Sequence, residues 1–237
     1  MLQRTPGAFH VKHLAALLAR FGAPETAAAP LARILELQAT DPTASTTVHE
    51  PAEALDRHVA DSLVALELPV VADARRIADL GSGAGWPGLA LAAALPSAQV
   101  ALVESAIRHC RYLEKAAEGL PNVSVVHARA EEWRDGLGAH DLITARALSA
   151  LPVVLEYAAP LLEEGGHVVA WKASVSDHES FGGARAAEIL GLEPVSVVPV
   201  RPFPDARDRT LHVFRKIAPT PSRFPRRPGM AVKRPLG

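Results

Sequence analysis

The chain has 237 residues, of which 49% are hydrophobic, and this length suits one domain of ordinary size with extensions. Its single cysteine, Cys110, excludes a disulfide framework and is typical of a reducing compartment. His10, Lys12 and His13 interrupt the first apolar run, and no stretch reaches the roughly 18 apolar residues of a membrane span. We therefore expect a cytoplasmic protein with no targeting segment and no membrane partner.

The net charge of −1 hides an uneven distribution of charged residues. The last twenty residues contain no acidic residue and five cations, which are Arg223, Arg226, Arg227, Lys233 and Arg234. A basic terminal segment is typical of contact with a polyanion such as a nucleic acid. A solvated terminus without a partner is the alternative that charge alone leaves open.

The first seventy residues have the apolar spacing of helices. Apolar side chains recur every three or four residues over 11–21, 31–39 and 51–68. Prolines separate these segments, and Pro51 stands where a helix accepts proline in its first turn. We predict an N-terminal helical extension over residues 1–70.

From residue 75, short β-rich runs alternate with helical segments. Strands are expected over 76–80, 99–104, 123–128, 141–147 and 167–173, and helices over 88–95, 105–120, 151–162 and 181–192. Two more β-rich runs, 194–200 and 209–217, have no helix between them. The pattern predicts an α/β, Rossmann-like domain over 71–217, with a mostly parallel seven-stranded sheet and an antiparallel edge. A basic extended tail over 218–237 would follow, because five prolines and few apolar residues fill it.

The segment IADLGSGAGWPG at the end of the first predicted strand indicates a ligand site. Backbone N–H groups at such a turn can hold a polar or anionic group. A P-loop is excluded because Leu89 stands where that motif requires lysine. The dinucleotide fingerprint matches only when it is started at Gly83, and Asp79 directly before the turn would oppose a pyrophosphate.

S-adenosylmethionine fits better, because it has a sulfonium and an ammonium and no phosphate. Asp79 would meet its cationic methionine part, and Gly81, Gly83 and Gly85 would let the backbone approach closely. The next two strands end at Glu104, placed to accept ribose hydroxyls, and at Ala130 and Glu131, placed near the adenine. A generic Rossmann-like domain with incidental acids is the alternative.

Several segments carry a family resemblance, among them RHVADSL (57–63), DLGSGAGWPGLALA (79–92), DLITARALSAL (141–151) and the tail from 220 to 236. The chain is similar to the bacterial 16S rRNA guanine-N7 methyltransferase family, RsmG or GidB, over nearly everything from about residue 50. The resemblance implies a monomer that uses S-adenosyl-L-methionine to methylate guanine N7 in 16S rRNA, free or in the small ribosomal subunit. It also implies cofactor contacts from Gly81, Trp86, Ala130, Glu131 and Arg146. Trp86 stands where phenylalanine or leucine is usual.

The reaction needs positioning more than acid–base chemistry. Guanine N7 has an exposed lone pair and loses no proton on attack, so no general base and no metal are expected. Arg146, after the fourth strand, is the candidate catalytic residue, unless it only forms an ion pair. Arg57 and Asp61 are predicted to pair across one helical turn, with His58 beside them as a substrate contact or as an ordinary satisfied histidine.

RNA binding requires cations that contact phosphates. The candidates are Arg57, Lys172, Arg207, Arg209, Arg223, Arg226 and Arg227. Because N7 lies in the deep, narrow groove of A-form RNA, the target guanine should be unpaired or flipped out. A small-molecule or protein methyltransferase, and a binding module without turnover, are the competing hypotheses.

Overall fold

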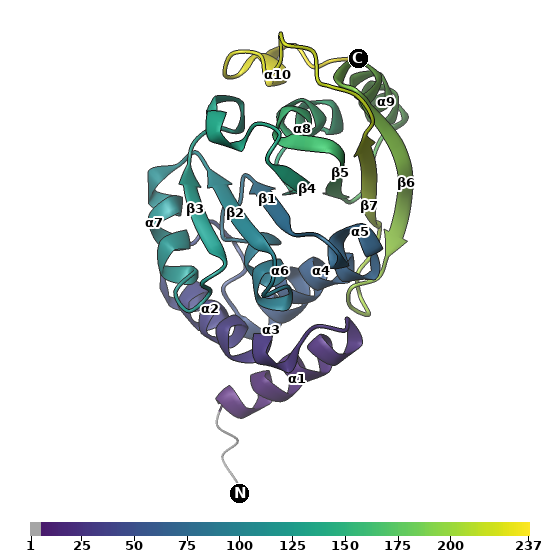
Figure 1. Ribbon diagram of the computed structural model, residues 1–237. Coiled ribbons are helices and arrows are strands. Elements are labelled where there is room, and N and C mark those ends of the chain that lie inside the picture. Colours follow the sequence, from purple (N-terminus) through teal and green to yellow (C-terminus); the bar gives the residue numbers. More distant parts are fainter. Residues whose placement is uncertain (1–5) are drawn as a thin grey trace, which may run out of the picture.

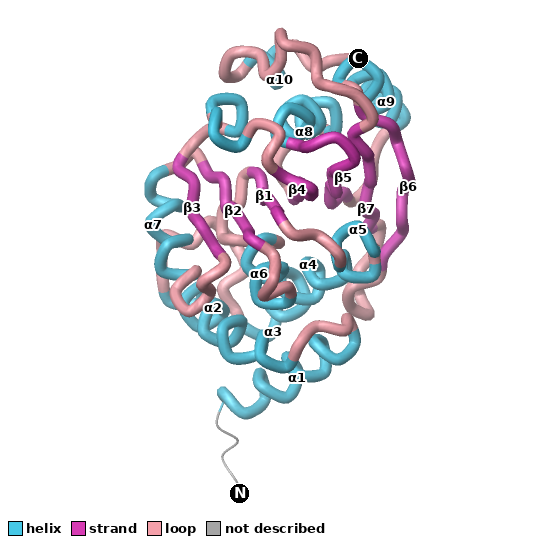
Figure 2. The backbone as a smooth tube through the Cα atoms, in the orientation of Figure 1, coloured by secondary structure: helices cyan, strands magenta, loops and turns pink. Residues whose placement is uncertain are grey.

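A computed structural model describes the backbone of residues 6–237 and the side chains from residue 12 onward. Residues 1–5 of the predicted extension, and the side chain of Val11 in its first apolar run, lie outside what is described. It has three layers, with one sheet between two sets of helices (Figures 1 and 2). The strand order is β3-β2-β1-β4-β5-β7-β6. The first five strands are parallel and β7 is antiparallel to both its neighbours, which confirms the predicted sheet.

The strands are β1 (Arg76–Leu80), β2 (Gln99–Glu104), β3 (Val123–His127), β4 (His140–Arg146), β5 (Leu162–Lys172), β6 (Leu192–Val200) and β7 (Arg209–Lys216). The helices are α1 (Pro6–Arg20), α2 (Ala28–Thr40), α3 (Pro51–Ala54), α4 (Asp61–Leu63), α5 (Pro69–Ala72), α6 (Gly88–Ala94), α7 (Ile107–Ala116), α8 (Leu151–Ala158), α9 (Asp177–Leu190) and α10 (Met230–Lys233). Some predicted boundaries are wrong. β5 begins at Leu162 and not at residue 167, and α9 begins at Asp177 and not at residue 181. The segment expected as one helix over 51–68 contains a π-helical stretch, Leu55–Ala60, between α3 and α4.

The two faces of the sheet bury alternate residues of each strand. Ile77 and Val100 belong to a core that includes α1, α2 and α6, whereas Ala78 and Ala101 belong to a second core formed with α8 and α9. This alternation follows from the two-residue period of a strand. In the centre of the sheet, where both faces are covered, the strands have apolar middles, as in Val100–Val103 of β2.

The N-terminal helices and the C-terminal segment are both packed onto the sheet domain. Leu14 and Leu31 lie in the same core as Leu89 of α6. At the other end, the segment 218–237 has little regular structure but runs across α8 and α9 (Figure 1), with Phe224 and Ala231 buried. The alternative of a solvated terminus is therefore wrong for the packed part of this segment. No helix among the described residues is long and apolar enough to cross a membrane.

A buried carboxylate holds the glycine turn at the end of β1. Asp79 is 1% exposed; its Oδ1 accepts a hydrogen bond from Thr144 Oγ1 at 2.8 Å, and its Oδ2 accepts one from the Gly88 backbone N–H at 3.3 Å. These contacts connect β1 to β4 and to the first residue of α6. Burial raises the pKa of Asp79 to about 6, while the donated hydrogen bonds act in the opposite direction.

We expect Thr144→Val to destabilise the fold by about 1–3 kcal/mol, because it removes a donor from a buried carboxylate and changes little else in shape. Urea unfolding at pH 7.5 measures the change. Thr40→Val is the matched control, because Thr40 is exposed and its hydroxyl contacts its own helix. Equal free energies of unfolding for the two variants would show that the Asp79 connection does not stabilise the turn.

Candidate active site

The glycine turn forms the floor of a cavity at the carboxyl ends of β1, β2 and β3. Gly81, Gly83 and Gly85 have φ values of 66°, 55° and 94°, a region that side chains rarely adopt. A Cβ at Gly81 would stand 2.6 Å from Leu148 Cδ1, and both residues line the cavity. The cavity measures about 190 Å³ and also has Ala130 and Glu131 in its wall. We call it the cofactor cavity.

Glu104 lies beside this cavity, at the end of β2. Its Oε2 accepts a hydrogen bond from the Gly83 backbone N–H at 3.1 Å, and its Oε1 accepts one from the Ala106 N–H at 2.8 Å. The carboxylate is 8% exposed and therefore fixes the middle of the glycine turn relative to β2. Its chain neighbours Val103 and Ser105 line the cavity, whereas Glu104 itself does not.

Two residues expected to meet the cofactor point elsewhere. The Asp79 carboxylate accepts hydrogen bonds from Thr144 and Gly88 and does not line the cofactor cavity, so its contact with the methionine part stays a prediction. The Trp86 side chain is buried under the N-terminal helices, where Nε1 donates to Gln38 Oε1 at 2.7 Å. It also stacks on His58 with ring centroids 5.7 Å apart. Trp86 thus anchors the turn to α2 instead of lining the cavity.

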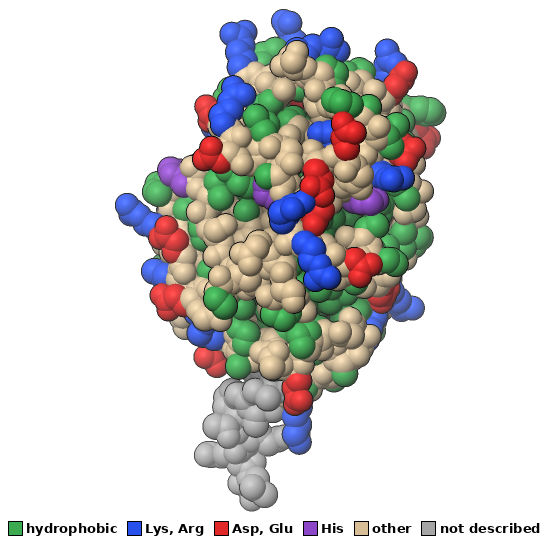
Figure 3. All heavy atoms as spheres, viewed as in Figure 1, with side chains coloured by type: hydrophobic (Ala, Val, Ile, Leu, Met, Phe, Trp, Pro, Cys, Tyr) green, Lys and Arg blue, Asp and Glu red, His purple; other side chains and the backbone are tan. Residues whose placement is uncertain are grey.

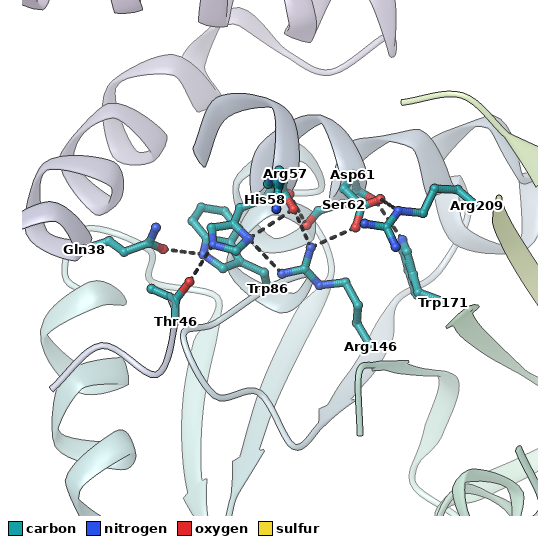
Figure 4. A network of polar contacts seen from close by, with 10 residues as sticks. All are labelled: Gln38, Thr46, Arg57, His58, Asp61, Ser62, Trp86, Arg146, Trp171 and Arg209. Carbon is teal, nitrogen blue, oxygen red and sulfur yellow. Dashed lines mark hydrogen bonds and ion pairs between the residues drawn. The ribbon is translucent and has the colours of Figure 1, made fainter. Parts of the chain in front are cut away.

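Arg146, the last residue of β4, connects the sheet to the N-terminal helices (Figure 4). Its Nη1 donates to Asp61 Oδ2 and to the Arg57 carbonyl oxygen, both at 2.9 Å. Its Nη2 lies 3.1 Å from His58 Nδ1. The ion pair that the sequence left as the alternative is therefore present. It does not exclude a ligand contact, because Arg146 also lines two cavities.

Asp61 lies between two arginines and keeps one oxygen without a hydrogen bond. Its Oδ1 is 3.4 Å from Arg209 Nε, has no hydrogen-bond partner among the described residues and is buried. Its backbone carbonyl accepts a hydrogen bond from Trp171 Nε1 at 2.7 Å, which fixes the residue in place. A buried acceptor without a partner is costly, so this oxygen marks a position where a donor would be favourable.

The predicted pair between Arg57 and Asp61 is wrong. Arg57 lies within the π-helical stretch and Asp61 directly follows it, and the Asp61 N–H reaches the Asp56 carbonyl five residues earlier. This wider turn removes the four-residue alignment of an α-helix. Arg57 Nε instead lies 3.0 Å from Glu53 Oε1 on the exposed side, which leaves Asp61 to Arg146 and Arg209.

His58 is a neutral part of this network. Burial, with a smaller effect from the Arg146 guanidinium, lowers its pKa to about 3. Its Nδ1 lies 3.1 Å both from Arg146 Nη2, which can only donate, and from the Arg57 carbonyl oxygen, which can only accept, so these two contacts favour opposite tautomers. Its Nε2 lies 3.0 Å from Thr46 Oγ1, a hydroxyl that can donate or accept. The structure therefore favours the satisfied histidine over a proton acceptor.

Two further hollows lie next to the cofactor cavity. One measures about 310 Å³ between the ends of β4 and β5 and shares Leu148 and Ser149 with the cofactor cavity; we call it the acceptor cavity. The other, the entrance hollow, measures about 640 Å³ and shares Asp61, Arg146 and Arg209 with the acceptor cavity. Its wall also includes Arg57 and Arg108, so its charge is strongly positive.

The other predicted cations are divided between two regions. Lys172 lines the acceptor cavity, where its Nζ lies 2.5 Å from Glu179 Oε1 and 2.8 Å from the Ser149 carbonyl. Arg207 is exposed and lines a hollow next to Arg209. Figure 3 shows further Lys and Arg side chains at the end of the molecule covered by the C-terminal segment, where Arg223 and Arg227 are exposed.

Sequence reasoning missed three contributors to this site. It assigned Asp61 to an intrahelical pair, and it gave no role to Arg108 or Thr144. Arg108 had a signal, because it opens the helix directly after the strand that ends at Glu104. Asp61 and Thr144 had none, because their partners are 85 and 65 residues away in sequence.

Comparison with known proteins places the chain among methyltransferases. A family model described as rRNA small subunit methyltransferase G (GidB) matches residues 37–205. The ribosomal RNA small subunit methyltransferase G of Rubrobacter xylanophilus is 41% identical over 195 residues, covering 79% of this chain and 75% of that protein. Its counterpart from Desulfitobacterium hafniense is 37% identical, covering 81% of both chains. The fold is shared with Aeropyrum pernix fibrillarin in complex with S-adenosyl-L-methionine (TM-score 0.52, 19% identity, 65% of this chain and 72% of that one).

The neutral state of His58 predicts a pH effect on stability. Its pKa is about 3 in the folded protein and near its ordinary value of 6.5 in the unfolded chain. The unfolded chain therefore binds the proton first, and the contribution of His58 is lost as the pH falls below 6.5. Between pH 7.5 and pH 5 the loss is about 2 kcal/mol, measured by urea unfolding, and His58→Gln should show a shallower dependence on pH. An NMR titration of the His58 ring with a midpoint near 6.5 would contradict this account.

Proposed function

Because the chain belongs to the GidB family of rRNA small subunit methyltransferases, we propose that it transfers a methyl group from S-adenosylmethionine to N7 of a guanine in 16S rRNA. One observation carries the proposal beyond family membership. The cofactor cavity and the acceptor cavity share a wall, Leu148 and Ser149, at the carboxyl end of the parallel sheet. A methyl donor and an acceptor base held in these two cavities would meet at that wall.

The residues of the cofactor cavity fit S-adenosylmethionine. A side chain at Gly81 would meet Leu148, which lines the same cavity, and the Glu104 carboxylate next to the lining residues Val103 and Ser105 suits two ribose hydroxyls. The glycine turn has no lysine where a P-loop requires one. When bound, this cofactor supplies an electrophilic methyl group on a sulfonium.

The protein's own part in the reaction is to hold and orient the base. N7 attacks with its lone pair, so no side chain has to remove a proton, and neutral His58 is not needed as a base. Arg146 and Asp61 keep each other in place at the junction of the acceptor cavity and the entrance hollow. Such preorganisation lowers the barrier by fixing the reacting atoms in advance.

Asp61 offers a means of selecting guanine. Asp61 supplies the one carboxylate in the wall of the acceptor cavity, beside three cations from Arg146, Lys172 and Arg209. Its Oδ1 is buried 3.4 Å from Arg209 Nε and has no hydrogen bond among the described residues. Guanine presents N1–H and 2-amino donors on one edge, which a carboxylate accepts, whereas adenine has no donor at N1. The carboxylate also offsets part of the positive charge that the base gains on methylation at N7.

RNA would approach over the entrance hollow. Arg57, Arg108, Arg207 and Arg209 line this hollow and its neighbour, where they can contact phosphates around a flipped-out base. We propose a monomeric enzyme that acts in the cytoplasm on 16S rRNA or on the small subunit.

The reaction is tested with tritiated S-adenosylmethionine and small ribosomal subunits from cells that lack the gene. Free 16S rRNA and bulk tRNA serve as comparison substrates. We expect label at one guanine of 16S rRNA, recovered as 7-methylguanosine after digestion. Cofactor binding without label in any of these RNAs would refute the proposal.

Asp61→Asn should lower kcat/KM for the RNA about a hundredfold. The variant leaves Arg146 and Arg209 without their carboxylate partner and presents an amide to the base. The affinity for S-adenosylmethionine should change much less, since Asp61 does not line the cofactor cavity. Exposed Asp73→Asn is the matched control. Loss of cofactor binding in Asp61→Asn, with the RNA dependence unchanged, would contradict the assignment.

A further inference from the structure

The C-terminal segment is held to the domain by a buried ion pair. Arg226 Nε and Nη2 donate to the two carboxylate oxygens of Glu156 at 2.6 and 2.5 Å. Glu156 lies in α8 and is 1% exposed, and its carboxylate raises the pKa of Arg226. Arg226 Nη2 also donates to the Arg234 carbonyl at 2.8 Å, which closes the segment into a loop. Arg226 thus has a structural partner in place of the RNA contact that the sequence suggested.

The loop held in this way reaches the cofactor cavity at two points. The Gly229 backbone N–H donates to Glu131 Oε1 at 3.1 Å, and Glu131 is one of the residues that line the cavity. Val232 of α10 lines the cavity as well, although its side chain is 59% exposed. Cavity residues therefore come from the strand ends, from α8 through Tyr157, and from the C-terminal segment.

An exposed valine at a cavity rim has a physical consequence. Apolar surface gains free energy when a ligand covers it. Glu131, which the sequence places near the adenine, is oriented by Gly229, so the segment also sets the position of a cavity carboxylate. Glu131 and Val232 line the cofactor cavity and do not line the acceptor cavity.

We propose that the segment 224–236 is part of the cofactor-binding site, with Val232 covering the adenosyl end of the ligand and the Arg226–Glu156 pair keeping Val232 and Gly229 in place. This inference rests on the proposed function, since it takes S-adenosylmethionine as the ligand. The same segment presents Arg227, Lys233 and Arg234 to solvent, so docking it also fixes the position of cations available to RNA.

Isothermal titration of the full-length protein with S-adenosylmethionine, without RNA, tests the proposal. Val232→Ala and Val232→Thr should weaken binding about three- to tenfold with little change in thermal stability, because Val232 is mostly exposed. Val197→Ala and Val197→Thr are the matched controls, since Val197 is 58% exposed on β6. They should leave the affinity unchanged.

Arg226→Ala should weaken cofactor binding about tenfold or more, because it releases the whole segment. Arg185→Ala, which breaks an exposed ion pair on α9, is its control. Wild-type affinity in the Val232 variants and in Arg226→Ala would overturn the inference and leave the segment a structural covering of α8. Absence of binding in the wild-type protein would instead refute the proposed function.

Discussion

The buried carboxylate of Asp79 is the constraint on which the geometry of the site depends. It joins the end of β1 to β4 through Thr144 and to α6 through Gly88. A parallel sheet brings its strand ends to one edge but does not by itself fix the loops there. Asp79 does this for the glycine turn, and Glu104 adds a second connection through Gly83. The cofactor cavity is consequently formed by backbone that carboxylates hold rigid.

Arg146 has the corresponding role for the acceptor side. It lies at the end of β4, but its guanidinium contacts three residues of the N-terminal helical region, Arg57, His58 and Asp61. The N-terminal helices therefore do more than cover one face of the sheet, because they supply the carboxylate of the acceptor cavity. The π-helical stretch makes this arrangement possible, since it turns Asp61 away from Arg57 and toward the sheet.

Patterns within the sequence predicted the fold well and the pairing of side chains poorly. Strand alternation and helical spacing are local, so the strands around 76–80, 99–104 and 141–147 were located to within a residue. The cavity position followed from the same patterns, because parallel strand ends must meet. The partner of each acidic side chain does not follow from local sequence. Asp79 and Glu104 both lie at the carboxyl end of a strand, yet the carboxylate of Asp79 is hydrogen-bonded to Thr144 and Gly88.

The same distinction applies to the basic C-terminal segment. Its composition indicates an unpacked tail and gives no means of distinguishing one of its arginines from another. In the structure Arg226 differs from Arg227 because a buried carboxylate in α8 lies within reach of the former. A buried acid costs free energy unless it is paired, so Glu156 requires a cation at that place, and the chain meets this need by folding its terminus back. The segment that the sequence predicted to be an RNA-binding tail thus contributes Val232 to the lining of the cofactor cavity. Its cations Arg227, Lys233 and Arg234 remain exposed to solvent.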